Sequence, residues 1–143
     1  IPRGEAQEYL DTYFARYTGV RDYMNNIKAQ AKEDKFVETI MGRRLYLNEI
    51  NAANGLRRQA AERAAINAPL QGSAADMTKL AMLGLWEEGI VPHVQVHDEV
   101  DISIQDDEQA ATVSRIMENC VELAVPLVVD TELGPNWGST EEI

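Results

Sequence analysis

Residues 57–82 read "RRQAAERAAINAPLQGSAADMTKLAM", and this stretch decides the fold. From residue 70 onward its apolar side chains recur every three or four positions, which is the spacing of one face of an α-helix. The pattern predicts a long helical region over about residues 55–88. Pro69 lies inside it, and because proline removes a backbone donor and collides with the preceding turn, we expect a kink or a restart there. Small residues at Gly72 and Gly84 allow neighbouring segments to approach closely.

Two helices and a hairpin are predicted before this region. Residues 3–17 and 20–35 carry apolar side chains at helical spacing. Their tyrosines are expected to face a core, as aromatic stripes with this spacing usually do. Residues 36–47, "FVETIMGRRLYL", predict two β-prone runs around a turn at Met41-Gly42.

The C-terminal part predicts a small sheet. "HVQVH" at residues 93–97 and "VDISI" at residues 100–104 are typical of strands, with Asp98 and Glu99 at their junction. "VPLVVDTEL" at residues 125–133 predicts a last strand. Helices combined with a small antiparallel sheet indicate an α+β fold.

Composition limits the class of protein. A length of 143 residues suits one domain or two small subdomains that share a core. No apolar run is long enough for a transmembrane helix, so no membrane partner is expected. The first residues lack an initiator Met and the layout of a signal peptide, so we expect the chain to begin inside something longer or to have been trimmed. Cys120 is the only cysteine, which excludes an internal disulfide.

The net charge of −11 is unevenly distributed. Residues 87–143 contain fourteen acids and one basic residue, Arg115, whereas residues 1–86 are slightly positive. Five arginines concentrate in the middle of the chain, at Arg43, Arg44, Arg57, Arg58 and Arg63. A local basic face of this kind can bind phosphate even in an acidic chain. Ordinary surface arginines are the alternative.

Asp98 and Glu99 are adjacent carboxylates next to His97. Oxygen ligands suit Mg²⁺, and two such ions about 4 Å apart can hold the attacking and leaving oxygens of a phosphoryl transfer. Two neighbouring carboxylates cannot fix two ions alone, so a third is required from elsewhere. The alternative is a solvated acidic turn. No cysteine or third histidine lies at zinc spacing, and no Walker or dinucleotide motif is present.

Arg63, Asn67 and Gln71 are spaced by four residues. Each step rotates only about 40° around a helix, so the three side chains share one stripe. All three can donate hydrogen bonds, and every base pair presents acceptors in the DNA minor groove. Such a donor stripe could check base-pair geometry without reading sequence. An ordinary polar helix face is the alternative.

These two motifs in this order closely resemble the C-terminal portion of family A DNA polymerases of the bacterial DNA polymerase I type. The resemblance covers nearly the whole chain, including "IPRGEAQEYLDTYFARYTGV" at residues 1–20, "MENC" with the later "VPL", and "NW" near the end. It implies that residues 1–52 belong to the fingers subdomain and residues 53–143 to the palm. The palm part would contain a small antiparallel sheet made of the active-site hairpin and the last strand, packed on helices.

The resemblance also implies roles for individual residues. Asp98 would be the direct Mg²⁺ ligand, Glu99 a supporting ligand, and His97 a neighbour of the primer terminus. Arg63, Asn67 and Gln71 would contact the primer–template in its minor groove. The four other arginines, Arg43, Arg44, Arg57 and Arg58, are candidates for phosphate contacts.

Two departures from the family pattern stand out. The family usually has an apolar residue where this chain has Asp101. Strand alternation would leave Asp101 facing solvent, and added negative charge near the metal ions is a weaker alternative. The second essential metal-binding aspartate of the family, together with its nucleotide-gripping helix, belongs upstream of residue 1.

We therefore expect the C-terminal part of a DNA-directed DNA polymerase that transfers a nucleotide from a dNTP to a primer 3′-OH, with two Mg²⁺ ions. Its partners would be primer–template DNA, dNTP and the remainder of the polymerase, and the chain alone would be inactive. The expected location is the cytoplasm of a bacterium or a phage-infected host, with an organelle as an open alternative. A non-catalytic DNA-binding module that retains the palm fold is the rival function, and a metal-dependent phosphohydrolase is a second rival.

Overall fold

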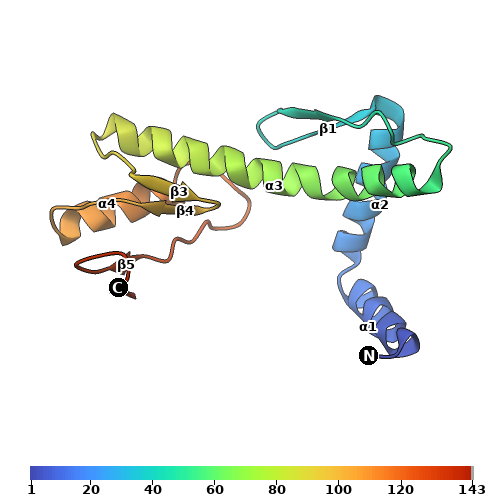
Figure 1. The fold of residues 1–143 in the computed structure, drawn as a ribbon, viewed down its shortest axis with the longest axis horizontal. Coiled ribbons are helices and arrows are strands. Elements are labelled where there is room, and N and C mark those ends of the chain that lie inside the picture. The colour runs from blue at the N-terminus through green and yellow to red at the C-terminus, as the bar shows by residue number, and fades with distance from the viewer. Residues whose placement is uncertain (143) are drawn as a thin grey trace. The chain divides into compact units, whose positions relative to one another are not determined.

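The computed structural model describes residues 1–142, and it confirms an α+β fold. Helices and short antiparallel hairpins alternate along the chain (Figure 1). Their bounds are α1 Arg3–Arg16, α2 Thr18–Asp34, β1 Phe36–Glu38, β2 Arg44–Tyr46, α3 Gly55–Glu87, β3 Val94–Val96, β4 Glu99–Asp101, α4 Asp107–Glu118, β5 Glu132–Leu133 and β6 Glu141–Glu142. No helix in this described part is long and apolar enough to cross a bilayer.

The chain forms two compact units, Ile1–Ser73 and Ala74–Ile143. Helix α3 contributes residues to both, so each unit is described by itself. The division into fingers and palm at residues 52 and 53 is a family-based one and stays a prediction.

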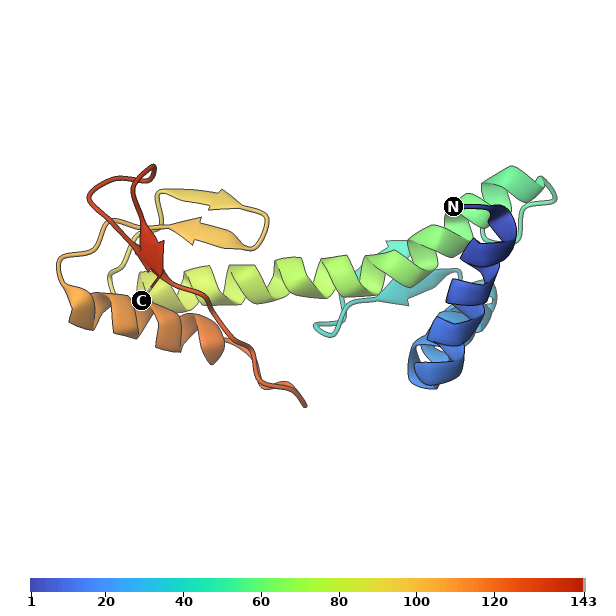
Figure 2. The same ribbon diagram turned by 90° about the horizontal axis from the view of Figure 1, so that it is seen from below.

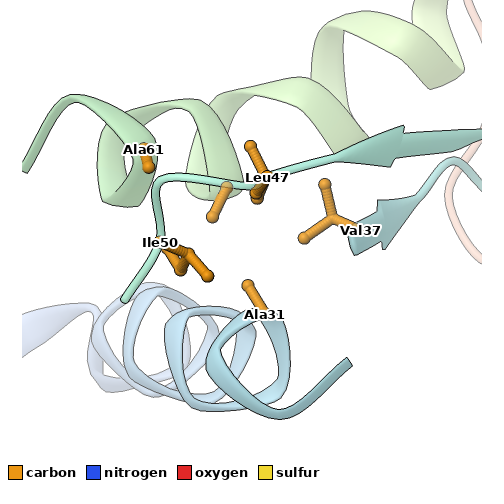
Figure 3. Packing of buried hydrophobic residues seen from close by; sticks show 6 residues of the cluster. Ala31, Val37, Leu47, Ile50 and Ala61 are labelled. Atoms are coloured by element: carbon orange, nitrogen blue, oxygen red, sulfur yellow. The ribbon is translucent and has the colours of Figure 1, made fainter. Parts of the chain in front are cut away.

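The core of the first unit lies between α2, the β1–β2 hairpin and the first half of α3 (Figure 3). Ala31, Val37 and Ile50 are at most 1% exposed, and they meet the small residues Ala61 and Ala65 of α3. Full burial of a Val or Ile side chain contributes about 1.5–3 kcal/mol, so these contacts are the main attachment of α3 in this unit.

Helix α3 runs through Pro69 without a restart. Of the kink or restart expected there, the restart is therefore wrong, and the kink stays a prediction. Proline costs the helix the one backbone hydrogen bond that its missing N–H would donate to the Ala65 carbonyl. The Ser73 hydroxyl donates to the Pro69 carbonyl at 2.5 Å, one turn further along. The flanking turns remain helical, and α3 appears as a single helix in Figure 2.

The β1–β2 hairpin is fastened to α3 at Gly72 and Ser73. The backbone N–H of Ile40 donates to Ser73 Oγ at 2.9 Å, and Arg43 Nη2 donates to the carbonyl of Gly72 at 2.9 Å. A Cβ atom on Gly72 would lie 2.6 Å from Thr39 Cγ2. The close approach predicted for this glycine is confirmed.

The second unit packs α4 against the C-terminal half of α3. A Cβ atom on Gly84 would lie 2.9 Å from Ile116 Cγ2, so this glycine also permits a close contact. Asp106 caps α4 by accepting a hydrogen bond from the Gln109 N–H at 2.8 Å. Leu85 of α3 and Ala110 of α4 are buried in this unit.

The predicted last strand forms only at its end. Residues 125–131 are not in a strand, and β5 pairs with β6 rather than with the β3–β4 hairpin. Gly134 permits the pairing of β5 with β6, because it lets the chain fold back closely. A Cβ there would lie 1.9 Å from the carbonyl oxygen of Ser139. The expected sheet of hairpin plus last strand is therefore replaced by separate two-stranded ribbons.

The tyrosines of α1 do not face a core within the described chain. Helix α1 has no buried residue. Its Tyr9 and Tyr13, and Tyr17 directly after its end, are between 46% and 67% exposed. The expectation of core packing holds for Tyr23 alone, which is half-buried and donates a hydrogen bond to the carbonyl of Ile66 at 3.0 Å. The helical spacing predicted that these tyrosines share one face of the helix. It could not show whether another part of the described chain packs against that face.

Gly72→Ala should destabilise the first unit. The new methyl group would enter the space of Thr39, whose β-branched side chain has little rotamer freedom, so the hairpin must shift at a cost of about 1–3 kcal/mol. Denaturant unfolding measures the change. Gly19→Ala is the matched control, because it is also helical and has open space around its Cβ. Equal stability of wild type and Gly72→Ala would contradict the close packing described here.

Candidate functional site

The β3–β4 hairpin presents His97, Asp98 and Glu99 at its tip. His97 and Asp98 form the two-residue turn, and Glu99 opens β4 opposite Val96. His97 has a positive φ of 55°, as the first residue of the primed turns that suit two-residue hairpins. Gln95 Nε2 closes the turn by donating to the carbonyl of His97 at 2.6 Å. The turn therefore fixes the three residues in one exposed group.

Asp98 and Glu99 are both exposed. Their oxygens are chemically suited to Mg²⁺. Within the described residues, however, no three His, Cys, Asp or Glu side chains gather closely enough to hold a metal ion. The pair therefore fits a metal ion only as part of a larger ligand set.

Asp101 is not solvent-facing, contrary to expectation. It lies on the same face of β4 as Glu99 and opposite Val94 in the strand register. The residue is half-buried, and its Oδ2 is enclosed without a hydrogen-bond partner in the part of the chain that the structure describes. An enclosed oxygen of this kind costs stability. The alternation of side chains along the strand predicts on which face of β4 Asp101 lies. It does not predict which residues enclose that side chain.

Arg63, Asn67 and Gln71 form one exposed stripe on α3, as predicted. The buried Ala65 precedes Asn67 by two residues, so about 160° separate them around the helix. The packed face of α3 therefore points away from the stripe. None of the three stripe side chains makes a hydrogen bond or ion pair to the described residues, so their donors are available to a ligand.

The four other arginines are engaged within the first unit. Arg44 also lies over the Phe36 ring, and the hydrogen bond that it donates to the Glu38 carboxylate is the main cause that raises its pKa. Arg57 is the most loosely held of the four. Their contacts are Arg43 to the Gly72 carbonyl at 2.9 Å, Arg44 to Glu38 at 2.6 Å, Arg57 to Glu49 at 3.7 Å, and Arg58 to the Ala52 carbonyl at 2.9 Å. A role in phosphate binding stays a prediction for all of them.

The structure thus brings the predicted residues together in two sets. The stripe belongs to the first unit, and the hairpin tip belongs to the second. The second unit also has an open groove of about 610 Å³ between α3 and α4, lined by Leu83, Ile116 and Cys120 among others. None of the predicted site residues lines this groove.

Comparison with known proteins gives one consistent family. Residues 1–139 match the family model described as DNA polymerase family A. The chain is 51% identical to DNA polymerase I of Pseudomonas aeruginosa over 96% of this chain and 16% of that protein. It is 44% identical to DNA polymerase I of Lactococcus lactis over 96% of this chain and 17% of that protein. It therefore spans about a sixth of the length of these curated relatives.

A solved structure is similar in three dimensions. It is the POL domain of Pol1 from M. smegmatis in complex with DNA primer-template and dNTP. The TM-score is 0.82 at 40% sequence identity, over 89% of this chain and 24% of that chain.

Asp101→Val should stabilise the chain. The substitution removes an enclosed oxygen that has no partner and introduces a side chain with high strand propensity, a gain of about 1 kcal/mol. Thermal unfolding measures it, and Asp101→Asn is the control, because it removes the charge but keeps two polar atoms in the same space. A loss of stability in Asp101→Val larger than in Asp101→Asn would show that the carboxylate is satisfied.

Proposed function

The chain belongs to DNA polymerase family A, and from this membership we propose that it forms the C-terminal fingers and palm portion of a DNA-directed DNA polymerase. The complete enzyme transfers a nucleotide from a dNTP to a primer 3′-OH and releases pyrophosphate. One observation carries the proposal. The exposed carboxylates of Asp98 and Glu99 lie at the tip of the β3–β4 hairpin, in a chain that also presents an exposed stripe of hydrogen-bond donors. The relative from M. smegmatis is described with DNA primer-template and dNTP, which supports the same partners here.

Asp98 and Glu99 are proposed to hold Mg²⁺ together with an aspartate from the remainder of the polymerase. Bound Mg²⁺ supplies electrostatic stabilisation to the charge that develops on the phosphoryl oxygens. Asp98, at the turn itself, is the direct ligand, and Glu99 supports it. His97 lies beside them and faces the primer terminus in this proposal.

Arg63, Asn67 and Gln71 are proposed to read the minor groove of the primer–template. Correct base pairs place acceptors at matching positions there, whereas mispairs displace them. The stripe donates to these acceptors, so a displaced acceptor weakens binding near the primer end. Among the other arginines, Arg57 is the most available for a phosphate contact, because its ion pair with Glu49 is long and exposed.

The chain is proposed to need the remainder of the polymerase for activity, because its own described residues provide an incomplete ligand set. Its proposed location is the bacterial cytoplasm or a phage-infected host. A non-catalytic DNA-binding module with the same fold remains the rival function. A phosphohydrolase would require Mg²⁺-dependent hydrolysis without template or dNTP.

Asp98→Ala in the complete polymerase should lower the rate of nucleotide incorporation by about three orders of magnitude, because a direct ligand is lost. DNA affinity should stay within about twofold. Single-turnover primer extension and DNA titration measure the two quantities. Asp130→Ala, an exposed acid of the same unit, is the matched control. An unchanged rate in Asp98→Ala would favour the non-catalytic module.

Gln71→Ala should slow extension of a matched primer by about five- to tenfold, the value of one lost hydrogen bond. Extension of a mismatched primer should change little, so the ratio of the two rates falls. Gln30→Ala makes the same chemical change on the exposed surface of α2 and should leave the ratio unchanged. An unaltered ratio in Gln71→Ala would refute the minor-groove role.

A further inference from the structure

Ser73 has the only buried polar side chain in the core of the described residues, at 8% exposure. Its hydroxyl makes two hydrogen bonds at once. It donates to the carbonyl of Pro69 at 2.5 Å and accepts from the backbone N–H of Ile40 at 2.9 Å. The first bond lies within α3, and the second reaches the tip of the β1–β2 hairpin. The Ser73 oxygen therefore takes part in both a bond within the helix and a bond to the hairpin, next to the bond from Arg43 to the Gly72 carbonyl.

This junction lies where α3 is locally weakest. Pro69 has no backbone N–H, so the turn that ends at Pro69 lacks one of its helical hydrogen bonds. Asn67 lies within this turn and Gln71 lies after it, so the stripe crosses the weakened point. Rotation or bending of the helix at Pro69 would change the direction of Gln71 relative to Asn67.

Three side chains hold α3 along one side of this region. The carbonyls of Ile66, Pro69 and Gly72 follow one another at steps of three residues, which places them along one ridge of the helix. Each accepts a hydrogen bond from a side chain. The donors are Tyr23 of α2 at 3.0 Å, Ser73 at 2.5 Å and Arg43 of the hairpin at 2.9 Å. Burial raises the pKa of the Tyr23 hydroxyl above its ordinary value.

We infer that Ser73 is a positioning residue for mismatch recognition, which it performs by holding the Pro69–Ser73 turn and therefore Gln71 in register with the rest of the stripe. The inference rests on the proposed minor-groove function of the stripe. A hydrogen-bond donor that is misplaced by about 1 Å distinguishes matched from mismatched base pairs much less well. The orientation of the turn that carries Gln71 therefore matters for the proposed role. Tyr23 holds the preceding turn at Ile66, and Arg43 bonds the Pro69–Ser73 turn at Gly72. The Ser73 hydroxyl bonds both Pro69 at the start of that turn and Ile40 of the hairpin, so it ties the turn that carries Gln71 to the hairpin.

The test uses the complete polymerase. Ser73→Ala should lower the ratio of matched to mismatched primer extension by about fivefold, close to the effect of losing one hydrogen bond, while DNA affinity stays within about twofold. Ser73→Thr keeps the hydroxyl and should restore the ratio. Thr78→Val is the matched control, because Thr78 makes the same type of bond, to the carbonyl of Ala74 at 3.1 Å, without any bond to the hairpin. If Ser73→Ala does not fold, Ser73→Cys replaces it, since a thiol is a weaker partner and should give an intermediate ratio.

A double variant separates positioning from stability. If Ser73 acts through Gln71, then Gln71→Ala combined with Ser73→Ala should show the ratio of Gln71→Ala alone. Additive losses would overturn the inference, and so would a lower melting temperature of Ser73→Ala with an unchanged ratio. If Gln71→Ala alone leaves the ratio unchanged, the proposed function of the stripe fails. If only Ser73→Ala leaves it unchanged, the inference fails and the stripe stands.

Discussion

The packing of the small-residue face of α3 against α2 and the β1–β2 hairpin is the constraint on which the first unit depends. Ala61 and Ala65 are small enough for Ile50 and Val37 to reach the helix, and Gly72 admits Thr39. Because this packing buries one face of α3, the opposite face of the helix is exposed to solvent. The polar stripe owes its exposure to the alanines and glycine behind it.

In the second unit, a short hairpin determines which side chains are exposed. A two-residue turn with a positive φ at His97 exposes neighbouring carboxylates, and the flanking β3 and β4 hold the turn in place. Neither unit alone contains a complete catalytic centre in the proposed mechanism. The proposed function accounts for the combination, since in it the first unit would contact the nucleic acid and the second would supply metal ligands.

The sequence predicted the helices, both early hairpins and the exposure of the stripe, because periodicity and turn residues report local structure directly. It failed where the outcome depends on a distant partner. A restart at Pro69 was one of the two expectations, and it is wrong because the packing of α3 against α2 and the hairpin on both sides of Pro69 is not visible in the local sequence. The tyrosines of α1 and the enclosed oxygen of Asp101 are further examples. A sequence pattern predicts which side chains share a face, but it does not predict which other segment packs against that face. The roles of Asp98, Glu99 and the stripe came from the family resemblance combined with their chemistry, and their geometry is compatible with those roles.

The central claim is that these residues supply part of a polymerase catalytic centre that other residues must complete. The most direct measurement is single-nucleotide primer extension with Mg²⁺ and dNTPs by the 143-residue chain, alone and together with a separate polypeptide that carries the remainder of the polymerase. We expect no extension by the chain alone and template-directed extension by the combination. Robust extension by the chain alone would contradict the account.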